Sequence, residues 1–236
     1  MKKAYYIAKK DFFEYFIKPP TLSWGITFPI AFALSFLIRG KDLFFLAPGL
    51  ITLASFFGTT SMASAAIVFE RRMKEFERMI VAPLDYWEIV LGKMIGSFLF
   101  GMLTSIVTIL FIIPLLGMYS LNLGILGIAL VLSSLVFAAF GVYISMMIND
   151  PRNVMVILNS VRFPMMFLSG VFIPLNTYPF MLQIIAYALP LTYEIELLRW
   201  VLTNNSFLNP FITIFGSIIW ILLFFVLSIW ALKRRY

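Results

Sequence analysis

The residues of this sequence that could do chemistry gather in one stretch, Glu70–Lys93, which holds five basic and five acidic side chains between two apolar runs. Four apolar residues recur there at the spacing of one helix face, namely Phe69, Met73, Phe76 and Ile80. Opposite charges fall one turn apart, where they can pair along the helix surface. An apolar stripe beside charges of both signs is suited to contact with another protein rather than to making bonds. The alternative is that this helix has no partner and its charged surface is simply solvated.

The end of this charged helix is marked by Pro83, and a second helix is predicted to begin directly after it. Asp85 is placed as the N-cap of that helix, and Glu88 three residues on completes a capping-box pattern. The sequence therefore predicts a short helix over Glu70–Ile80, held between two apolar segments and displayed to water.

Arg162 is a different kind of candidate, because it is a lone charge within an apolar run. It follows Asn153 by nine residues, which is roughly 13 Å along a helix. A guanidinium at that depth must face protein, a polar cavity or a subunit interface. We expect its donors to meet neutral oxygens, such as the Ser160 or Ser169 hydroxyl or those of residues 43–69. Two interpretations remain: a structural arginine, or a site for a polar or anionic part of a ligand.

Composition removes several classes of chemistry. The chain has neither cysteine nor histidine, which excludes disulfides, thiolate catalysis, most zinc and haem sites and histidine acid–base chemistry. We expect no catalytic, cofactor-binding or metal-binding residue. The formal charge of +7 does not indicate nucleic acid, since the basic residues lie beside apolar runs rather than in a free basic domain.

Those apolar runs predict the elements that position the candidates. Of the 236 residues, 62% are hydrophobic and 12% charged, more apolar surface than a soluble domain buries. Long uncharged runs predict an all-α integral membrane protein, in one domain over 1–236, with six transmembrane helices. Their expected ranges are 21–38, 43–69, 94–116, 123–148, 154–173 and 207–232.

Lysine and arginine set the orientation. With the N-terminus in the cytoplasm, fourteen of them lie on the cytoplasmic side, against Arg39, Lys41 and Arg199 outside. Both termini are therefore expected in the cytoplasm of a multi-pass protein of the cell membrane. The opening residues lack the uninterrupted apolar core and cleavage site of a signal peptide, so we expect no removal.

Two further segments flank the spans. Residues 1–20 read as an interfacial amphipathic helix whose apolar side holds Tyr5, Tyr6, Ala8, Phe12, Phe13, Phe16 and Ile17, whereas Ile7 falls on the polar side. Residues 174–206 read as an extracytoplasmic re-entrant pair, with helices over Thr177–Ala188 and Thr192–Leu202 that each begin near a capping threonine and are divided by Pro190.

Small residues inside the spans admit two interpretations. The run from Ala54 to Ala66, and the pair Gly92 and Gly96, can line a translocation path or permit close helix packing. We expect packing, the usual role of small residues between helices in lipid.

Two motifs together resemble the ABC type-2 transporter permeases, a family that includes drug, antibiotic and polysaccharide exporters. ERRMKEFERMIVAPLDYWEIVLGK, at 70–93, is similar to the family's charged helix, proline–leucine pair, aromatic residues and Gly-Lys step into the third span. FLSGVFIPLNTYPFMLQIIAYALPLTYEIELLRWVL is similar to its SG-x-x-x-P, NPLTY and closing arginine elements. Leu189 stands where the family commonly has asparagine.

The resemblance implies a half-transporter that forms a homodimer or heterodimer and is driven by separate ABC ATP-binding subunits. Each such subunit would bind ATP and magnesium and receive the cytoplasmic segment, 70–93, as a coupling segment. The implied coupling residues are Glu70, Arg71, Arg72, Glu75, Phe76, Arg78 and Pro83, and Arg162 is a candidate for the substrate path. The expected cargo is drug-like, lipid-like or a polysaccharide. No GxxxxGK[ST] motif occurs in the sequence, so ATP would be hydrolysed by a partner chain.

The principal alternative is an ion-driven secondary carrier or channel. Such proteins usually place ionisable groups at membrane depth, and no Asp or Glu falls inside any expected span. A membrane enzyme is the second alternative, but histidine and membrane aspartate are both lacking and no convergent polar cluster is evident.

Overall fold

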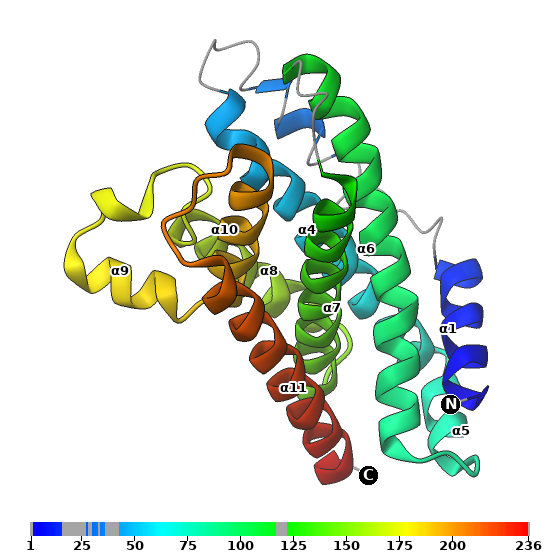
Figure 1. Ribbon diagram of the computed structural model, residues 1–236. Helices are drawn as coiled ribbons and strands as arrows, with labels where there is room; N and C mark the ends of the chain where they lie inside the picture. The colour runs from blue at the N-terminus through cyan, green and yellow to red at the C-terminus, as the bar shows by residue number, and fades with distance from the viewer. Residues whose placement is uncertain are drawn as a thin grey trace.

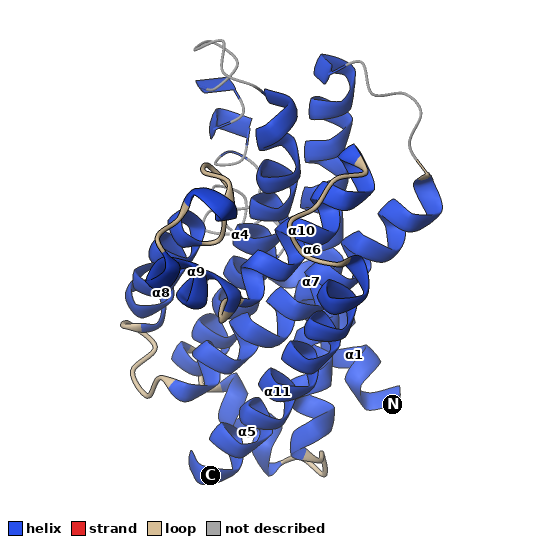
Figure 2. Ribbon diagram, turned by 60° about the vertical axis from the view of Figure 1, so that its left-hand side comes forward, coloured by secondary structure: helices blue, strands red, loops and turns tan. Residues whose placement is uncertain are grey.

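The computed structural model describes residues 2–15, 27, 30–32, 34–35, 43–116 and 122–235. Throughout these residues the regular structure is helical, without a strand (Figure 2), which confirms the all-α prediction. Of the expected first span, 21–38, only residues 27, 30–32 and 34–35 are among the described residues.

Four long helices form the bundle: α4 (Leu43–Arg72), α6 (Tyr86–Leu116), α7 (Leu123–Met147) and α11 (Pro210–Arg235). Each is long and apolar enough to cross a bilayer. α4 is central and packs against α6, α7 and α10 (Pro190–Thr203) (Figure 1). A helix pairs its interior backbone groups within the segment, as hydrocarbon requires, and its apolar side chains can face lipid.

Small residues bring these helices together, which confirms the packing interpretation. A Cβ on Gly58 of α4 would lie 2.5 Å from the Thr104 hydroxyl of α6. A Cβ on Gly141 of α7 would lie 2.9 Å from the backbone of Thr60. The interior of α4 is therefore filled by neighbouring helices.

The helix expected over 154–173 is shorter than predicted. α8 (Val154–Leu168) ends five residues early, because Gly170 adopts a left-handed conformation with φ of 81°. At about 1.5 Å per residue, its 15 residues cover about 22 Å, less than the roughly 30 Å hydrocarbon core.

The helical pair expected over 174–206 also differs in its boundaries. A 3-10 helix, Leu175–Thr177, precedes α9 (Phe180–Tyr187), and α10 follows after a bend of 88°. Neither expected threonine cap is present: α9 is preceded by Pro179, and Pro190 occupies the first turn of α10. Thr192 instead lies inside α10 and donates to the Ala186 carbonyl at 2.6 Å, across the break. The division at Pro190 is confirmed.

The N-terminal helix α1 (Lys2–Tyr15) packs on α6 with a face that the sequence did not predict. Its buried residues are Ala4, Ile7, Ala8, Asp11 and Tyr15, whereas Tyr5, Tyr6 and Phe13 are exposed. Ile7, which the sequence placed on the polar side, packs directly on Gly92. A Cβ added to Gly92 would lie 2.8 Å from the Cβ of Ile7. Gly92 and Gly96 thus form the groove that receives α1.

The charged segment is not one continuous helix over Glu70–Ile80, so that prediction was wrong. α4 runs through Arg72, the chain turns at Lys74 with φ of 58°, and α5 (Glu75–Val81) follows. The turn redirects the chain across the end of the bundle (Figure 1). One half of the predicted capping box is present, because the Glu88 carboxylate accepts from the Asp85 backbone N–H at 3.4 Å.

Candidate functional site

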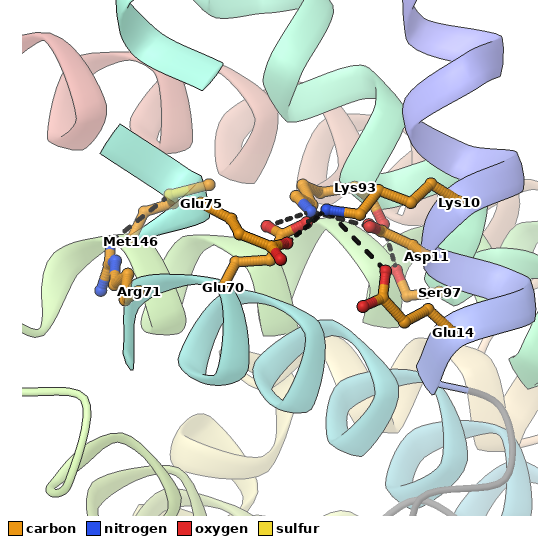
Figure 3. Close-up of polar contacts among 9 residues, drawn as sticks. All are labelled: Lys10, Asp11, Glu14, Glu70, Arg71, Glu75, Lys93, Ser97 and Met146. Carbon is orange, nitrogen blue, oxygen red and sulfur yellow. Dashed lines mark hydrogen bonds and ion pairs between the residues drawn. The ribbon is translucent and has the colours of Figure 1, made fainter. Parts of the chain in front are cut away.

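At the end of the bundle that carries α5, four helices meet around a cluster of charges, drawn in Figure 3. Lys93 of α6 lies at its centre and donates to Asp11 Oδ1 at 2.9 Å and to Glu70 Oε2 at 2.5 Å. All three side chains are buried. We call Asp11, Glu70 and Lys93 the buried charge cluster. It joins α1, α4 and α6, and buried charges persist only when paired in this way.

Lys10 extends the cluster towards water and towards α5. Its ammonium lies 3.2 Å from Glu70 Oε1, 2.7 Å from Glu75 Oε2 and 3.8 Å from Glu14 Oε2. Glu75 is the first residue of α5, so Lys10 connects α1 to both α4 and α5. These contacts make α1 part of the same unit as the charged segment.

Burial and neighbouring charges shift the pKa values of several groups in this corner. Burial raises the pKa of the Asp11 carboxyl to about 7, opposed by the Lys93 charge and assisted by that of Glu70. Burial lowers the pKa of Lys10, but the hydrogen bond to Glu75 and the charge of Glu70 outweigh it and raise the pKa overall. The hydrogen bond from Lys10 in turn lowers the pKa of Glu75.

A second set of contacts, made by Arg71 of α4, connects α5 to the end of α7. Arg71 Nη1 donates to the carbonyls of Ser145 at 2.8 Å and Ile148 at 2.9 Å, at the end of α7. Its guanidinium carbon lies 5.1 Å from the centre of the Phe76 ring, which is fully buried. Phe76 therefore anchors α5 to the bundle and presents no surface to a partner.

The sequence-predicted coupling residues thus separate into two groups. Glu70, Arg71 and Phe76 lie inside and fix the corner, and Glu75 pairs with Lys10 at its edge. Arg72, Arg78 and Pro83 are exposed, together with the apolar side chains of Met73 and Val81.

Three residues of this corner escaped the sequence prediction, namely Lys10, Asp11 and Lys93. Each lies among other charges or at the edge of a span, where a solvated side chain is the ordinary expectation. The signal in the sequence was the pair Gly92 and Gly96, which flank Lys93. Glycines at these two positions allow another helix to pack closely, and that helix covers the lysine.

Arg162 of α8 is fully buried, as predicted for a charge at that depth. Its Nη1 donates to Ser61 Oγ of α4 at 3.1 Å and to Asn159 Oδ1 at 3.2 Å. The guanidinium carbon lies 5.4 Å from the centre of the Phe57 ring. The predicted hydroxyl from residues 43–69 is therefore confirmed in Ser61. The hydroxyls of Ser160 and Ser169 donate instead to carbonyls one turn back in their own chain segment.

Arg199 joins the two ends of the second motif. It forms an ion pair with Glu196, which lies one turn earlier on α10, and its Nη2 donates to the Gly170 carbonyl at 2.8 Å. Glu196 also accepts from the Phe207 backbone N–H at 2.6 Å. The serine–glycine turn after α8 and the connection into α11 are thereby fastened to α10.

Among the described residues, four to five apolar helices are capable of spanning and lie next to a charged helical corner, which defines a multi-pass membrane protein. A model of the ABC-2 type transporter family matches residues 3–203 of this sequence. The chain belongs to that family and is a transport permease of the ABC-2 type.

Individual relatives agree with this assignment. A putative transport permease, ycf38 of Cyanophora paradoxa, is 24% identical over 97% of this chain and 82% of its own length. The inner membrane transport permease YadH of Escherichia coli strain K12 is 23% identical over 81% of this chain and 74% of its own. The probable multidrug ABC transporter permease YbhR of the same strain is 21% identical over 70% of this chain but 45% of its own length.

Proposed function

We propose that this chain is the membrane-spanning subunit of an ATP-driven exporter, energised by a separate ATP-binding subunit that docks on α5. The observation that carries the proposal is the construction of the α5 corner, by which we mean α5, the turn before it and the buried charge cluster. Its outer surface combines exposed apolar side chains, Met73 and Val81, with Arg72 and Arg78. Its inner side is fixed to α1, α4, α6 and α7 by the contacts described above. A displaced α5 would therefore displace the bundle, as coupling to an ATPase requires.

The membrane arrangement in this proposal has six spans, with 21–38 as the first, α1 at the headgroup level and α9–α10 as an outward re-entrant pair. The start of α1, α5 and the end of α11 all lie at one end of the molecule (Figure 1), which supports a cytoplasmic location for both termini. Arg235 at that end donates to the carbonyls of Ile148 at 2.9 Å and Asn149 at 2.6 Å.

The complete transporter would pair two such permease chains, identical or not, with two ATPase subunits that hold ATP and magnesium. The cargo is drug-like, lipid-like or a polysaccharide. Arg162 belongs to the substrate path as the residue that fastens α8 to α4 through Ser61. Its Nε and Nη2 have no hydrogen-bond partner among the described residues and remain as donors for a polar group of the cargo.

Ion-driven transport stays as the second candidate on one observation. The sequence placed no acid inside a span, yet Glu194 and Glu196 of α10 are both fully buried. α9 and α10 together pass as a bent span by length and composition, and if they cross the bilayer both acids lie at membrane depth.

Purification separates the two candidates. The chain is co-expressed with an ABC ATP-binding subunit from a neighbouring gene of the same genome, and the complex is reconstituted in liposomes. Co-purification, and transport that stops when the phosphate-binding lysine of that ATPase is replaced, are the expected results. Transport driven by an ion gradient without ATP would overturn the proposal.

A further inference from the structure

Glu194 is a buried carboxylate to which none of the interactions described so far assigns a role. It lies on α10, fully buried, and neither oxygen accepts a hydrogen bond from the described residues. The Ser217 hydroxyl of α11 lies within reach of it but donates to the Thr213 carbonyl at 2.8 Å. A carboxylate in this condition is costly, and in a membrane protein it marks a site for a cation or a proton.

The neighbouring charges do not supply the missing cation. Arg199 is on the same helix, but it is paired with Glu196 and bound to the Gly170 carbonyl. α10 therefore buries two carboxylates and one guanidinium, with Glu194 as the acid in excess.

An apolar groove runs along the same contact between α10 and α11. Its volume is about 630 Å³, and Tyr193, Phe211, Phe215 and Gly216 are among the residues that line it. The Tyr193 ring packs directly on Gly216, because a Cβ added to that glycine would lie 2.6 Å from Cδ1 of the ring. The Tyr193 hydroxyl donates to the Tyr187 carbonyl at 2.8 Å. Phe211 and Phe215 are 82% and 66% exposed, so the groove opens on the outer face of α11.

Glu194 is not one of the residues that line the groove, but it is the chain neighbour of one of them. Tyr193 and Gly216 line the groove, and their chain neighbours Glu194 and Ser217 are buried in the same α10–α11 contact. A positive charge in the groove would interact with Glu194 through protein rather than water, where Coulomb attraction is strong. The aromatic rings would accept the apolar body of the ligand and add a cation–π contribution.

We propose that the α10–α11 groove and Glu194 form a binding site for a lipophilic cation that enters from the membrane. Charge complementarity selects this occupant over a lipid acyl chain, which would fill the groove but leave the carboxylate unpaired. The inference deepens the proposed function, since it names the cargo class, and as cargo selection it rests on that function. Binding itself requires neither ATP nor the ATPase.

The test is equilibrium binding to the full chain in phosphatidylcholine nanodiscs, with empty nanodiscs subtracted. The probes are methyltriphenylphosphonium and triphenylphosphine oxide, which share the three phenyl rings and differ in charge. Wild type is expected to bind the cation more tightly than the neutral probe. Glu194→Gln should weaken cation binding about tenfold, equivalent to about 1.4 kcal/mol, and leave the neutral probe unchanged. Glu194→Asp should retain most of the cation affinity.

Two controls keep the outcome decisive. Glu77→Gln removes an exposed carboxylate of α5 and should bind both probes as wild type does. Phe215→Ala removes a groove wall and should weaken both probes. Unchanged cation binding in Glu194→Gln, or equal loss of both probes, overturns the proposal. Cation binding by a chain that never associates with an ATPase would instead contradict the proposed function and leave this site standing.

Discussion

At the scale of single residues, this membrane protein stabilises its buried charges in different ways. Lys93 is held by two carboxylates, whereas Arg162 is held by two neutral oxygens and an aromatic ring. The sequence could predict burial for Arg162, because a charge deep in an apolar run cannot reach water. It could not do so for Lys93, because a lysine at the edge of a span ordinarily reaches the headgroups.

The buried charge cluster predicts that docking of α1 depends on pH. Because the folded-state pKa of Asp11, about 7, exceeds its ordinary value, folding favours the protonated form. Its contribution to stability is therefore present at low pH and lost as pH rises through 7. We expect α1 to be held less firmly at pH 8 than at pH 6, by about 1 kcal/mol.

Hydrogen–deuterium exchange of the α1 amides, corrected for intrinsic rates, measures this difference. Asp11→Asn should remove the pH step, and Asp85→Asn, at an exposed carboxylate, should keep it. Equal protection of α1 at both pH values in wild type would contradict the assignment.

Arg162 predicts a graded loss of transport. Arg162→Lys keeps the charge but loses the planar guanidinium whose Nη1 reaches both Ser61 and Asn159, and Arg162→Gln also loses the cation above Phe57. Transport should fall by a factor of roughly three at each step, with normal assembly. Ser160→Ala, whose hydroxyl bonds only to the Val156 carbonyl among the described residues, is the control. Normal transport in both arginine variants would remove Arg162 from the substrate path.

At the scale of elements, apolar runs located the bundle helices but not their ends. α4 continues to Arg72 and α6 begins at Tyr86, since charged residues are good helix formers and the helices extend past the membrane. The break at Lys74 was missed, because its left-handed backbone carries no glycine or asparagine to signal it. The buried face of α1 was also missed. Its partner groove at Gly92 and Gly96 is made by another helix, and the pattern of α1 alone cannot show it.

The construction of α5 predicts different outcomes for three substitutions. Arg72→Glu reverses an exposed charge and should lower substrate-stimulated ATPase activity about tenfold without affecting membrane insertion. Glu75→Lys opposes Lys10 and should impair both coupling and the protection of α1. Phe76→Asp buries a charge and should prevent the corner from folding.

The measurements are ATPase activity of the reconstituted complex and the yield of inserted chain. Lys233→Glu reverses an exposed charge at the end of α11 and serves as the control. Normal coupling in Arg72→Glu and Glu75→Lys alike would exclude α5 as the docking element.

At the scale of the whole molecule, the arrangement in the membrane depends on whether α9 and α10 cross the bilayer. α1, α5 and the end of α11 share one end, and α9 and α10 meet at a bend of 88°, which suits either a re-entrant loop or a broken span. If the pair is re-entrant, both of its ends lie outside. If α9 and α10 form one bent span, its ends lie on opposite sides.

Cysteine labelling decides between these arrangements, because the chain contains no cysteine of its own. Asn176 and Asn204 lie before α9 and after α10, and both are exposed. Cysteines placed singly at these positions should both react with a membrane-impermeant maleimide added to intact cells, and Glu77→Cys on α5 should react only after lysis. Labelling of Asn176→Cys and Asn204→Cys from opposite sides would show that α9 and α10 cross the bilayer. It would also place one chain terminus outside unless residues 21–38 do not span.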